Sequence, residues 1–386
     1  MTFAENTDDI PFNRPYMTGR ELHYICQAHL VNQQFSGNGP FTKSCQRWLT
    51  GHTSSSGTLL THSCTAALEM AALLANVGEG DEIIMPSYTF VSTATAFALR
   101  GCCPVFLDIR PDTLNINETL LESAINSRTR VIVPVHYAGV GCEMDVITSL
   151  AKKYDILVIE DAAQAIMSSY HGYSLGAIGD LGTYSFHETK NVICGEGGAL
   201  LINNQEFTSR AEIIWEKGTD RSRFFRGETD RYTWQDIGSS FLPGELTAAF
   251  LLAQLEEART LTTQRLRIWS LYHEYLAPLE NQGYIRRPII PKHCQHNAHM
   301  YYIILAESGL RADLIRFLKC KGISSIIHYV PLHNSPGGKL FGRCHGELTV
   351  TEEVSESILR LPLWIGMEIS HIERVVMALT EFYRIR

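Results

Sequence analysis

Lys190 is the residue of this sequence best suited to covalent chemistry. It ends the segment SFHETK, which follows an apolar run and precedes the glycine-rich GEGG at 195–198. A lysine on a loop above a sheet could reach a cofactor aldehyde, and burial would lower its pKa and free the amine for imine formation. Ser185 could donate to a phosphate. GEGG does not match GxGxxG and precedes a strand, which argues against a dinucleotide loop. The alternative for Lys190 is an ordinary exposed lysine.

A carboxylate at the end of an apolar strand is a second candidate. Asp161 and Gln164 lie in the segment VIEDAAQ, where the apolar run stops. A carboxylate in this place could hold the protonated ring nitrogen of a pyridine cofactor, which would keep that ring an electron sink. The competing interpretation is a strand-end aspartate that caps the next helix.

Two further segments offer polar groups. Ser63, Cys64 and Thr65 precede the run AALEMAALLA, which predicts a helix start whose free N–H groups form a phosphate cradle, or a plain N-cap. His328 and His333 flank a proline in HYVPLH. A zinc site needs at least three protein ligands and no third is evident nearby, so we expect no metal and favour a neutral polar pocket.

The pattern around these residues predicts the elements that position them. Between 57 and 203, apolar runs such as EIIMPS, PVFLDI and ILVIED alternate with helical stretches, which is typical of an α/β domain with a mostly parallel sheet. Ligands of such sheets bind beyond the carboxyl ends of the strands. We expect a large domain over 1–245, then a bridging helix and a small α+β domain over 246–386. In the latter, a strand is predicted over SSIIHYVPLH.

Charge and cysteine usage exclude several classes. The 386 residues carry a net charge of -8 without a basic run, so neither nucleic acid nor an anionic membrane is an expected partner, and any phosphate site must be local. The first residues lack the basic start and apolar run of a signal peptide. The ten cysteines form no CxxC pair. We therefore expect a cytoplasmic protein with reduced thiols.

Taken together and in order, SCTAALEMA, PSYTFVSTA, DIRPDTLNIN, VIEDAAQA, SFHETKN, GEGGALLIN and HYVPLH resemble the DegT/DnrJ/EryC1/StrS sugar aminotransferases over nearly the whole chain. The resemblance implies fold type I of the aspartate aminotransferase superfamily and pyridoxal 5'-phosphate (PLP) as cofactor. It makes Lys190 the Schiff-base lysine, Asp161 the partner of the ring nitrogen and Gln164 the residue near the ring hydroxyl. The family's remaining cofactor positions are the phosphate residues Cys64, Thr65 and Ser185 and the stacking aromatic Phe90.

One position departs from the family pattern. Many members carry an asparagine after the 230s that reaches the phosphate of the partner subunit, whereas this chain has Ser240. The contact is then made by the shorter hydroxyl or is lost. Because sites of this fold type lie between two subunits, the resemblance also implies a homodimer or a higher homo-oligomer.

Within the family, PFNRP, FFRGETDRYTWQDIGSSF and NAHMYYI resemble members that aminate C-4 of dTDP-4-keto-6-deoxyglucose, with L-glutamate as donor. Their product, dTDP-4-amino-4,6-dideoxygalactose, feeds surface polysaccharides. HYVPLH matches a stretch that in the family approaches the active site, so His328, Tyr329 and His333 could bind sugar hydroxyls. Arg226 and Arg231 could meet the diphosphate. The competing interpretation is that the histidines pack the small domain and the arginines form surface ion pairs. Alternatives are a C-3 aminotransferase, a UDP- or GDP-linked keto sugar, or a non-catalytic regulatory relative.

Overall fold

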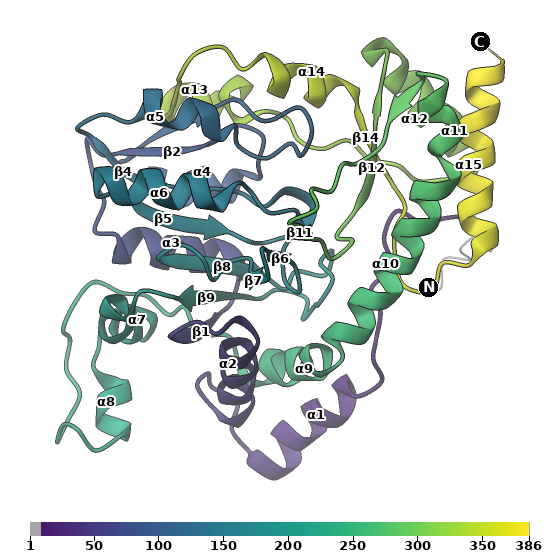
Figure 1. Ribbon diagram of the computed structural model, residues 1–386. Helices are drawn as coiled ribbons and strands as arrows, with labels where there is room; N and C mark the ends of the chain where they lie inside the picture. The colour runs from purple at the N-terminus through teal and green to yellow at the C-terminus, as the bar shows by residue number, and fades with distance from the viewer. Residues whose placement is uncertain (1–8, 386) are drawn as a thin grey trace.

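An eight-stranded sheet forms the centre of the larger part of the molecule (Figure 1). The structure is a computed structural model that describes residues 9–385, so the extension before PFN lies largely outside the described residues. All neighbouring strands are parallel except for β9, which is antiparallel to both of its neighbours. The predicted mostly parallel sheet is confirmed. In sheet order the strands are β1 (Gly57–Thr61), β9 (Gly198–Ile202), β8 (Leu181–Ser185), β5 (Leu157–Asp161), β4 (Thr129–Ile132), β2 (Glu82–Pro86), β3 (Cys103–Leu107) and β13 (Arg343–Cys344).

The continuous apolar runs of these strands follow from burial of both sheet faces. Consecutive side chains of a strand point to opposite faces. Ile84 and Ile132 accordingly belong to one core, whereas Ile83, Met85 and Val131 belong to the core on the other face. Helices cover both faces. On the first lie α2 (Pro40–Thr53), α6 (Met144–Tyr154) and α9 (Glu245–Glu256), and on the second α3 (Cys64–Leu74), α4 (Val91–Ala98) and α7 (Thr208–Trp215).

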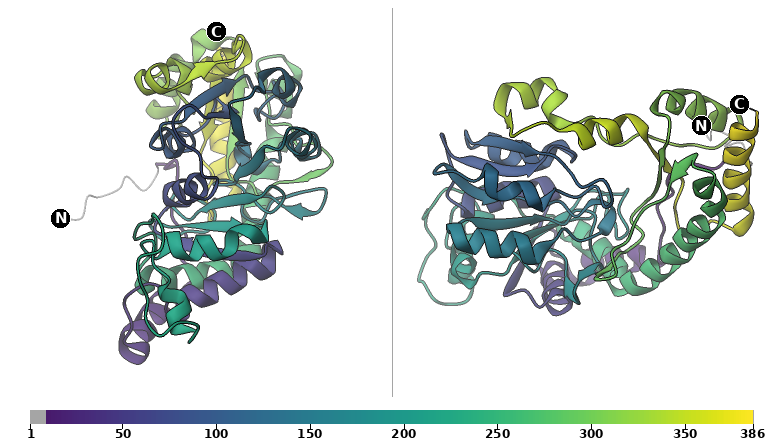
Figure 2. Two further views of the ribbon diagram at one scale, coloured as in Figure 1. Left: turned by 90° about the vertical axis from the view of Figure 1, so that its left-hand side faces the viewer. Right: turned by 45° about the horizontal axis from the view of Figure 1, so that its top comes forward.

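A smaller α+β part is built around the antiparallel sheet β10 (Ile285–Arg286), β12 (Tyr301–Leu305) and β14 (Ile358–Leu361). Its core contains Trp269, Tyr301 and Leu379. The helices around this sheet are α10 (Ala258–Tyr275), α11 (Ala277–Asn281), α12 (Arg311–Cys320) and α15 (Ile369–Arg384). Between the two parts the chain returns to the large sheet through α13 (Pro336–Phe341) and α14 (Thr349–Ser357), which Figure 2 shows crossing above the strands.

The helical stretch after residue 245 is divided. It breaks at Glu257, and the apolar residues Ala248 and Leu255 of α9 pack in the core of the large sheet rather than with the small part. Helix α10 then crosses from one core to the other. At the opposite end of the chain, Ile10 is fully buried in the core of the C-terminal part. The described N-terminal segment therefore starts on the small part, not on the large one.

The strand predicted over SSIIHYVPLH is wrong. Only Ile326 forms an isolated bridge, with Arg360, and the following residues are irregular. The reason is that this segment leaves the small part and crosses to the large one. There the N–H groups of Leu332 and His333 bond to the carbonyl and hydroxyl of Ser87, which follows β2.

The remaining elements are short. Helices α1 (Glu21–Gln27) and α5 (Leu121–Ala124) lie at the edges, and a small sheet contains β6 (Ser169–Tyr170), β7 (Tyr173–Ser174) and β11 (Cys294–Gln295). Helix α8 (Arg221–Phe225) and the loop after it extend away from the large part, at the lower left of Figure 1.

Candidate active site

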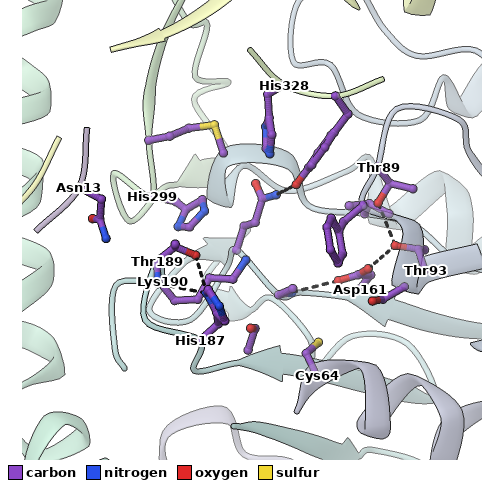
Figure 3. A pocket seen from close by; sticks show the side chains of 18 of the residues that line it. Asn13, Cys64, Thr89, Thr93, Asp161, His187, Thr189, Lys190, His299 and His328 are labelled. Carbon is purple, nitrogen blue, oxygen red and sulfur yellow. Dashed lines mark hydrogen bonds between the residues drawn. The ribbon is translucent and has the colours of Figure 1, made fainter. Parts of the chain in front are cut away.

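A cavity of about 680 Å³ lies between the two parts, beyond the carboxyl ends of the parallel strands. The large part contributes the start of α3, the end of β5 and the Lys190 loop. The small part contributes the segment at 326–329 and the end of β14, and residues 12 and 13 add a third wall. In Figure 3, Lys190 and Asp161 project into the same space, with Cys64 on one side of it and His328 on the other. The sequence predicted that the ligand site lies at this edge of the sheet.

The first turn of α3 lines one end of this cavity. Ser63 caps the helix, because its hydroxyl accepts a hydrogen bond from the N–H of Ala66 at 3.1 Å. The hydroxyl of Thr65 is hydrogen-bonded to that of Ser92 at 2.7 Å. Cys64 and Ser185 line the cavity beside them. Free N–H groups and hydroxyls at a helix start form a site for a phosphate.

Gly198, the last glycine of GEGG, allows α3 to begin here. A Cβ at this residue would lie 2.4 Å from the backbone nitrogen of Cys64 and 2.4 Å from the carbonyl carbon of Ser63. The first residue of β9 and the start of α3 are thus in backbone contact. The glycine is required by this close approach and not by nucleotide binding.

We expect Gly198→Ala to displace the start of α3 and to weaken both PLP binding and folding. Overpacking against rigid backbone costs about 3 kcal/mol in stability. PLP titration of the apoenzyme and thermal melting would measure both effects. The matched control is Gly57→Ala on β1, where a Cβ would meet nothing within 4 Å. If the two variants bind PLP equally well, the close approach does not form the cradle.

Asp161 is nearly buried at the end of β5, with its carboxylate oriented from two sides. One oxygen accepts a hydrogen bond from the hydroxyl of Thr93 at 2.6 Å, and the other accepts from the N–H of Ala163 at 3.1 Å. Thr93 in turn is hydrogen-bonded to Thr89 at 2.8 Å. The carboxylate thus holds a turn after the strand, not the start of a helix as the competing interpretation proposed, and it also lines the cavity.

The loop that carries Lys190 is closed by backbone hydrogen bonds. Phe186 donates to Gly197 at 2.8 Å, Glu188 to Gly195 at 2.9 Å, and Lys190 itself to His187 at 2.9 Å. Burial lowers the pKa of Lys190, and the neighbouring Arg360 lowers it further, while Cys64 and Asp161 oppose both effects. A lowered pKa increases the fraction of free amine, which is the form that attacks an aldehyde.

Gln164 connects the two parts across the cavity. Its side-chain oxygen accepts a hydrogen bond from the N–H of Ala138 at 2.7 Å, and its nitrogen donates to the hydroxyl of Tyr329 at 3.0 Å. The ring of Phe90 is 58% exposed and lines the cavity, 6.4 Å from the ring of Tyr329. An aromatic face that remains open in a cavity can stack on a planar ring.

The substrate residues expected in HYVPLH are separated by the fold. His328 and Tyr329 line the cavity, and a ring nitrogen of His328 is hydrogen-bonded to the hydroxyl of Tyr137 at 3.1 Å. Burial and the nearby cations Arg360 and Lys190 lower the pKa of His328, which keeps the ring neutral. His333 does not line the cavity. Its ring bonds to Ser87 at 2.7 Å and to Glu352 at 3.2 Å.

Three other expected residues lie outside the cavity of their own chain. Arg226 is ion-paired with Glu212 at 2.9 Å and with Glu228 at 2.7 Å. Arg231 and Ser240 are exposed on the loop after α8. None of the three lines the cavity of its own chain, and the ion pairs of Arg226 are those of the surface alternative.

Several residues that line the cavity are not predicted from the sequence. They are Phe12, Asn13, Arg265, His299 and Arg360. The signals that could have found them were Arg360 inside the apolar run ILRLPLW, His299 in NAHMYYI, and the motif PFNRP for Phe12 and Asn13. Among the described residues, no group of three or more His, Cys, Asp and Glu side chains could hold a metal ion. Within residues 9–385, which the structure describes, no helix is long and apolar enough to cross a membrane.

The cavity fits PLP in four respects. It offers a phosphate cradle at the start of α3, a carboxylate at Asp161, an open aromatic face at Phe90 and an amine of lowered pKa at Lys190. This set on a mostly parallel sheet with a C-terminal α+β part defines a PLP-dependent aminotransferase of fold type I.

Comparison with known proteins identifies the family. Residues 17–380 match the model of the DegT/DnrJ/EryC1/StrS aminotransferase family, and the chain belongs to that family. An uncharacterized protein of Methanocaldococcus jannaschii, MJ1066, is 33% identical over 365 residues, which is 93% of each chain. The aminotransferase TlmJ from Streptoalloteichus hindustanus is 26% identical, with a TM-score of 0.87 over 96% of this chain and 97% of its own. Spr1654 from Streptococcus pneumoniae in its PMP-form is also 26% identical, with a TM-score of 0.89 over 97% and 98%.

Proposed function

We propose that this enzyme transfers the amino group of L-glutamate to C-4 of dTDP-4-keto-6-deoxyglucose, as a dTDP-4-amino-4,6-dideoxygalactose transaminase. The product would serve surface polysaccharides such as enterobacterial common antigen. The observation that carries the transaminase chemistry is the meeting of Lys190, Asp161 and Tyr329 around one cavity. The choice of sugar rests on the likeness of PFNRP, FFRGETDRYTWQDIGSSF and NAHMYYI to that subgroup. The ten free cysteines are compatible with action in the cytoplasm.

In this proposal, Lys190, Asp161 and Gln164 each have a different role. PLP, when bound, supplies an electron sink for the negative charge that develops when a proton leaves the carbon bearing the amine. The amine of Lys190 holds the cofactor in the resting enzyme, then accepts the proton from the donor α-carbon and returns it. The Asp161 carboxylate keeps the proton on the ring nitrogen. Gln164 holds the ring hydroxyl, and Thr65, Ser185 and the N–H groups of α3 hold the phosphate.

In the second half-reaction the same steps take place in the opposite order on the keto sugar. Lys190 delivers a proton to C-4, so the face of the sugar presented to Lys190 determines the new stereocentre. His328 and Tyr329 are neutral donors and acceptors at the opposite wall, which suits them to bind sugar hydroxyls. The pathway requires both substrates to bind in turn in the same cavity.

The partner subunit would complete this site. Arg226, Arg231 and Ser240 lie on a segment that extends away from their own cavity, and Trp234 on the same segment is 82% exposed. An exposed aromatic with arginines beside it is suited to an interface. We therefore propose a homodimer or a higher homo-oligomer in which these arginines meet the diphosphate of the sugar nucleotide bound by the partner, since Arg suits bidentate phosphate contacts.

The decisive experiment mixes the PLP-loaded enzyme with L-glutamate and separate keto sugar nucleotides. The mass of the product from dTDP-4-keto-6-deoxyglucose should show that one amino group has replaced the keto oxygen, and its NMR spectrum should show that this amino group is axial at C-4, as in the galactose configuration. Amination at C-3, or activity only with a UDP- or GDP-linked sugar, would support another transaminase of the family. No turnover with any keto sugar would favour a non-catalytic regulatory relative.

His328→Ala should impair the sugar half-reaction selectively. The ring lines the cavity and keeps one nitrogen on Tyr137, so its loss removes a neutral hydrogen-bond partner of the sugar. Loss of one such bond costs about 1 kcal/mol, or roughly fivefold in affinity. Rapid mixing of the amine-loaded enzyme with keto sugar would measure this, and the glutamate half-reaction should change less than threefold. Equal impairment of both half-reactions would remove His328 from the sugar site.

A further inference from the structure

The imidazole of His299 has one nitrogen that is open to the cavity. The residue lines the cavity just before β12, and only 6% of it is exposed. Its Nδ1 is hydrogen-bonded to the side-chain oxygen of Asn191 at 3.1 Å, whereas Nε2 has no hydrogen-bond partner within residues 9–385. In Figure 3, His299 and Lys190 lie on the same side of the cavity. A buried polar atom without a partner points to a group that it binds during the reaction.

The amide of Asn191 determines which nitrogen of His299 carries the proton. The side-chain nitrogen of Asn191 donates to the carbonyl of Asn297 at 2.7 Å. Because a carbonyl can only accept, the amide must turn its oxygen toward His299, and Nδ1 must then be the N–H of the ring. The other nitrogen, Nε2, is therefore a hydrogen-bond acceptor.

The backbone of His299 is fixed from two sides. Its N–H donates to the side-chain oxygen of Asn297 at 3.0 Å, and its carbonyl accepts from Arg265 of α10 at 2.8 Å. The side-chain nitrogen of Asn297 in turn donates to two carbonyls in the turn after β5, both at 2.8 Å. The loop that carries Asn191, the turn after β5 and the start of β12 thus meet at this one ring, which holds its orientation.

The surroundings of His299 favour the neutral ring. Burial lowers its pKa, and neighbouring positive charges lower it further. The groups that act on it from the adjacent elements are Lys190, Arg360, Arg265 and His328. A protonated ring would add another cation to this wall. A neutral ring can instead accept an N–H from a cation, so the fixed tautomer suits a positively charged donor.

The amine of Lys190 is the donor that this acceptor fits. Its Nζ has no hydrogen-bond partner in the part of the chain that the structure describes, and a flexible four-carbon stem lets it turn within the cavity. Asn191 follows Lys190 directly, so one loop holds both the amine and the amide that orients the ring. We propose that Nε2 of His299 accepts a hydrogen bond from the Lys190 amine when that amine is not bound to the cofactor, and holds it as an ammonium after it has taken the proton. His299 is then a positioning residue that acts through Lys190. The proposal rests on the role of Lys190 proposed above.

His299→Asn and His299→Gln separate the two nitrogens of the ring. Asparagine keeps a donor in the place of Nδ1 but has no acceptor in the place of Nε2, whereas the longer glutamine carries its amide to that place. Loss of an acceptor for a charged group disfavours the ammonium about tenfold. The pKa of Lys190 in the apoenzyme should therefore fall by about one pH unit in His299→Asn and by much less in His299→Gln. Competitive acetylation of Lys190 as a function of pH measures this pKa without cofactor or turnover. An unchanged pKa in a His299→Asn protein that melts like wild type would overturn the proposal.

The kinetics of the PLP-loaded enzyme give a second readout. Lys190 moves the proton in both half-reactions, so His299→Asn should slow both by about tenfold, and His299→Gln should restore both to within threefold of wild type. The matched control is His296→Asn, the same change in the same segment but outside the cavity, which should leave both rates unchanged. A loss confined to the sugar half-reaction would assign Nε2 to a sugar hydroxyl and overturn the proposal.

Nitrogen NMR of the apoenzyme with labelled histidine reads the tautomer directly. The His299 signals, identified by their loss in His299→Gln, should show a protonated Nδ1 and an unprotonated Nε2 at neutral pH. The opposite tautomer or an imidazolium would overturn the proposal. The role of Lys190 fails separately. A borohydride label on another lysine would overturn that role even if His299→Asn shifts the pKa of Lys190, whereas a label on Lys190 without this shift would overturn only the role of His299.

Discussion

The Lys190→Ala protein is expected to fold, to bind PLP without a covalent bond and to lose turnover entirely. The lysine contributes both the amine that holds the cofactor and the base that moves the proton, so no other group replaces both functions. Removal of the side chain should not destabilise the fold. Its loop is closed by backbone hydrogen bonds at Phe186 and Glu188, and burial already disfavours the charged amine.

Three measurements separate this outcome from unfolding. The visible absorbance of wild-type enzyme should be absent from the variant, the melting temperatures should agree, and borohydride should fix the cofactor to the wild-type peptide that contains Lys190. Lys152→Ala, at an exposed position on α6, is the control and should retain activity. Recovery of the label on a different lysine would contradict the assignment.

Asp161→Asn should lower the rate on the order of 100-fold or more while the cofactor remains bound. An amide is isosteric, and its oxygen can still accept from the N–H of Ala163 while its nitrogen donates to the hydroxyl of Thr93, but it carries no charge to hold the proton on the ring nitrogen. Without that proton the ring withdraws fewer electrons, and loss of such an electrostatic group costs about 100-fold to 1,000-fold in kcat. Single-turnover rates with L-glutamate would measure this effect on proton removal directly.

Stability should respond differently to the same change. The carboxylate is nearly buried, so its neutral replacement removes a desolvated charge and leaves the turn at Ala163 with an acceptor. Melting of Asp161→Asn within a few degrees of wild type would therefore assign the rate loss to electronics. Thr93→Val, which removes only the hydroxyl that orients the carboxylate, should be much less impaired. A near-wild-type rate for Asp161→Asn would disprove the role.

Much of the large part was predictable from local pattern. Runs such as EIIMPS and ILVIED indicate strands buried on both faces, and parallel strands have their carboxyl ends at one edge. Asp161 and Lys190 each follow a predicted strand, so the sequence placed both at that edge. The structure added that their strands, β5 and β8, are neighbours. The chemical types of the two residues indicated the cofactor, and the order of motifs indicated the family.

The side of the cavity formed by the small part and the N-terminal segment was decided only by the tertiary structure. Phe12, Tyr329 and Arg360 are far apart in the sequence and meet because the N-terminal segment packs on the C-terminal core and a crossing segment returns to Ser87. Hydrophobic periodicity reports whether a side chain is buried, not which distant residue it meets. For the same reason His328 and His333, equivalent in the pattern, have different surroundings. Irregular backbone after Ile326 directs one into the cavity and the other onto Ser87 and Glu352.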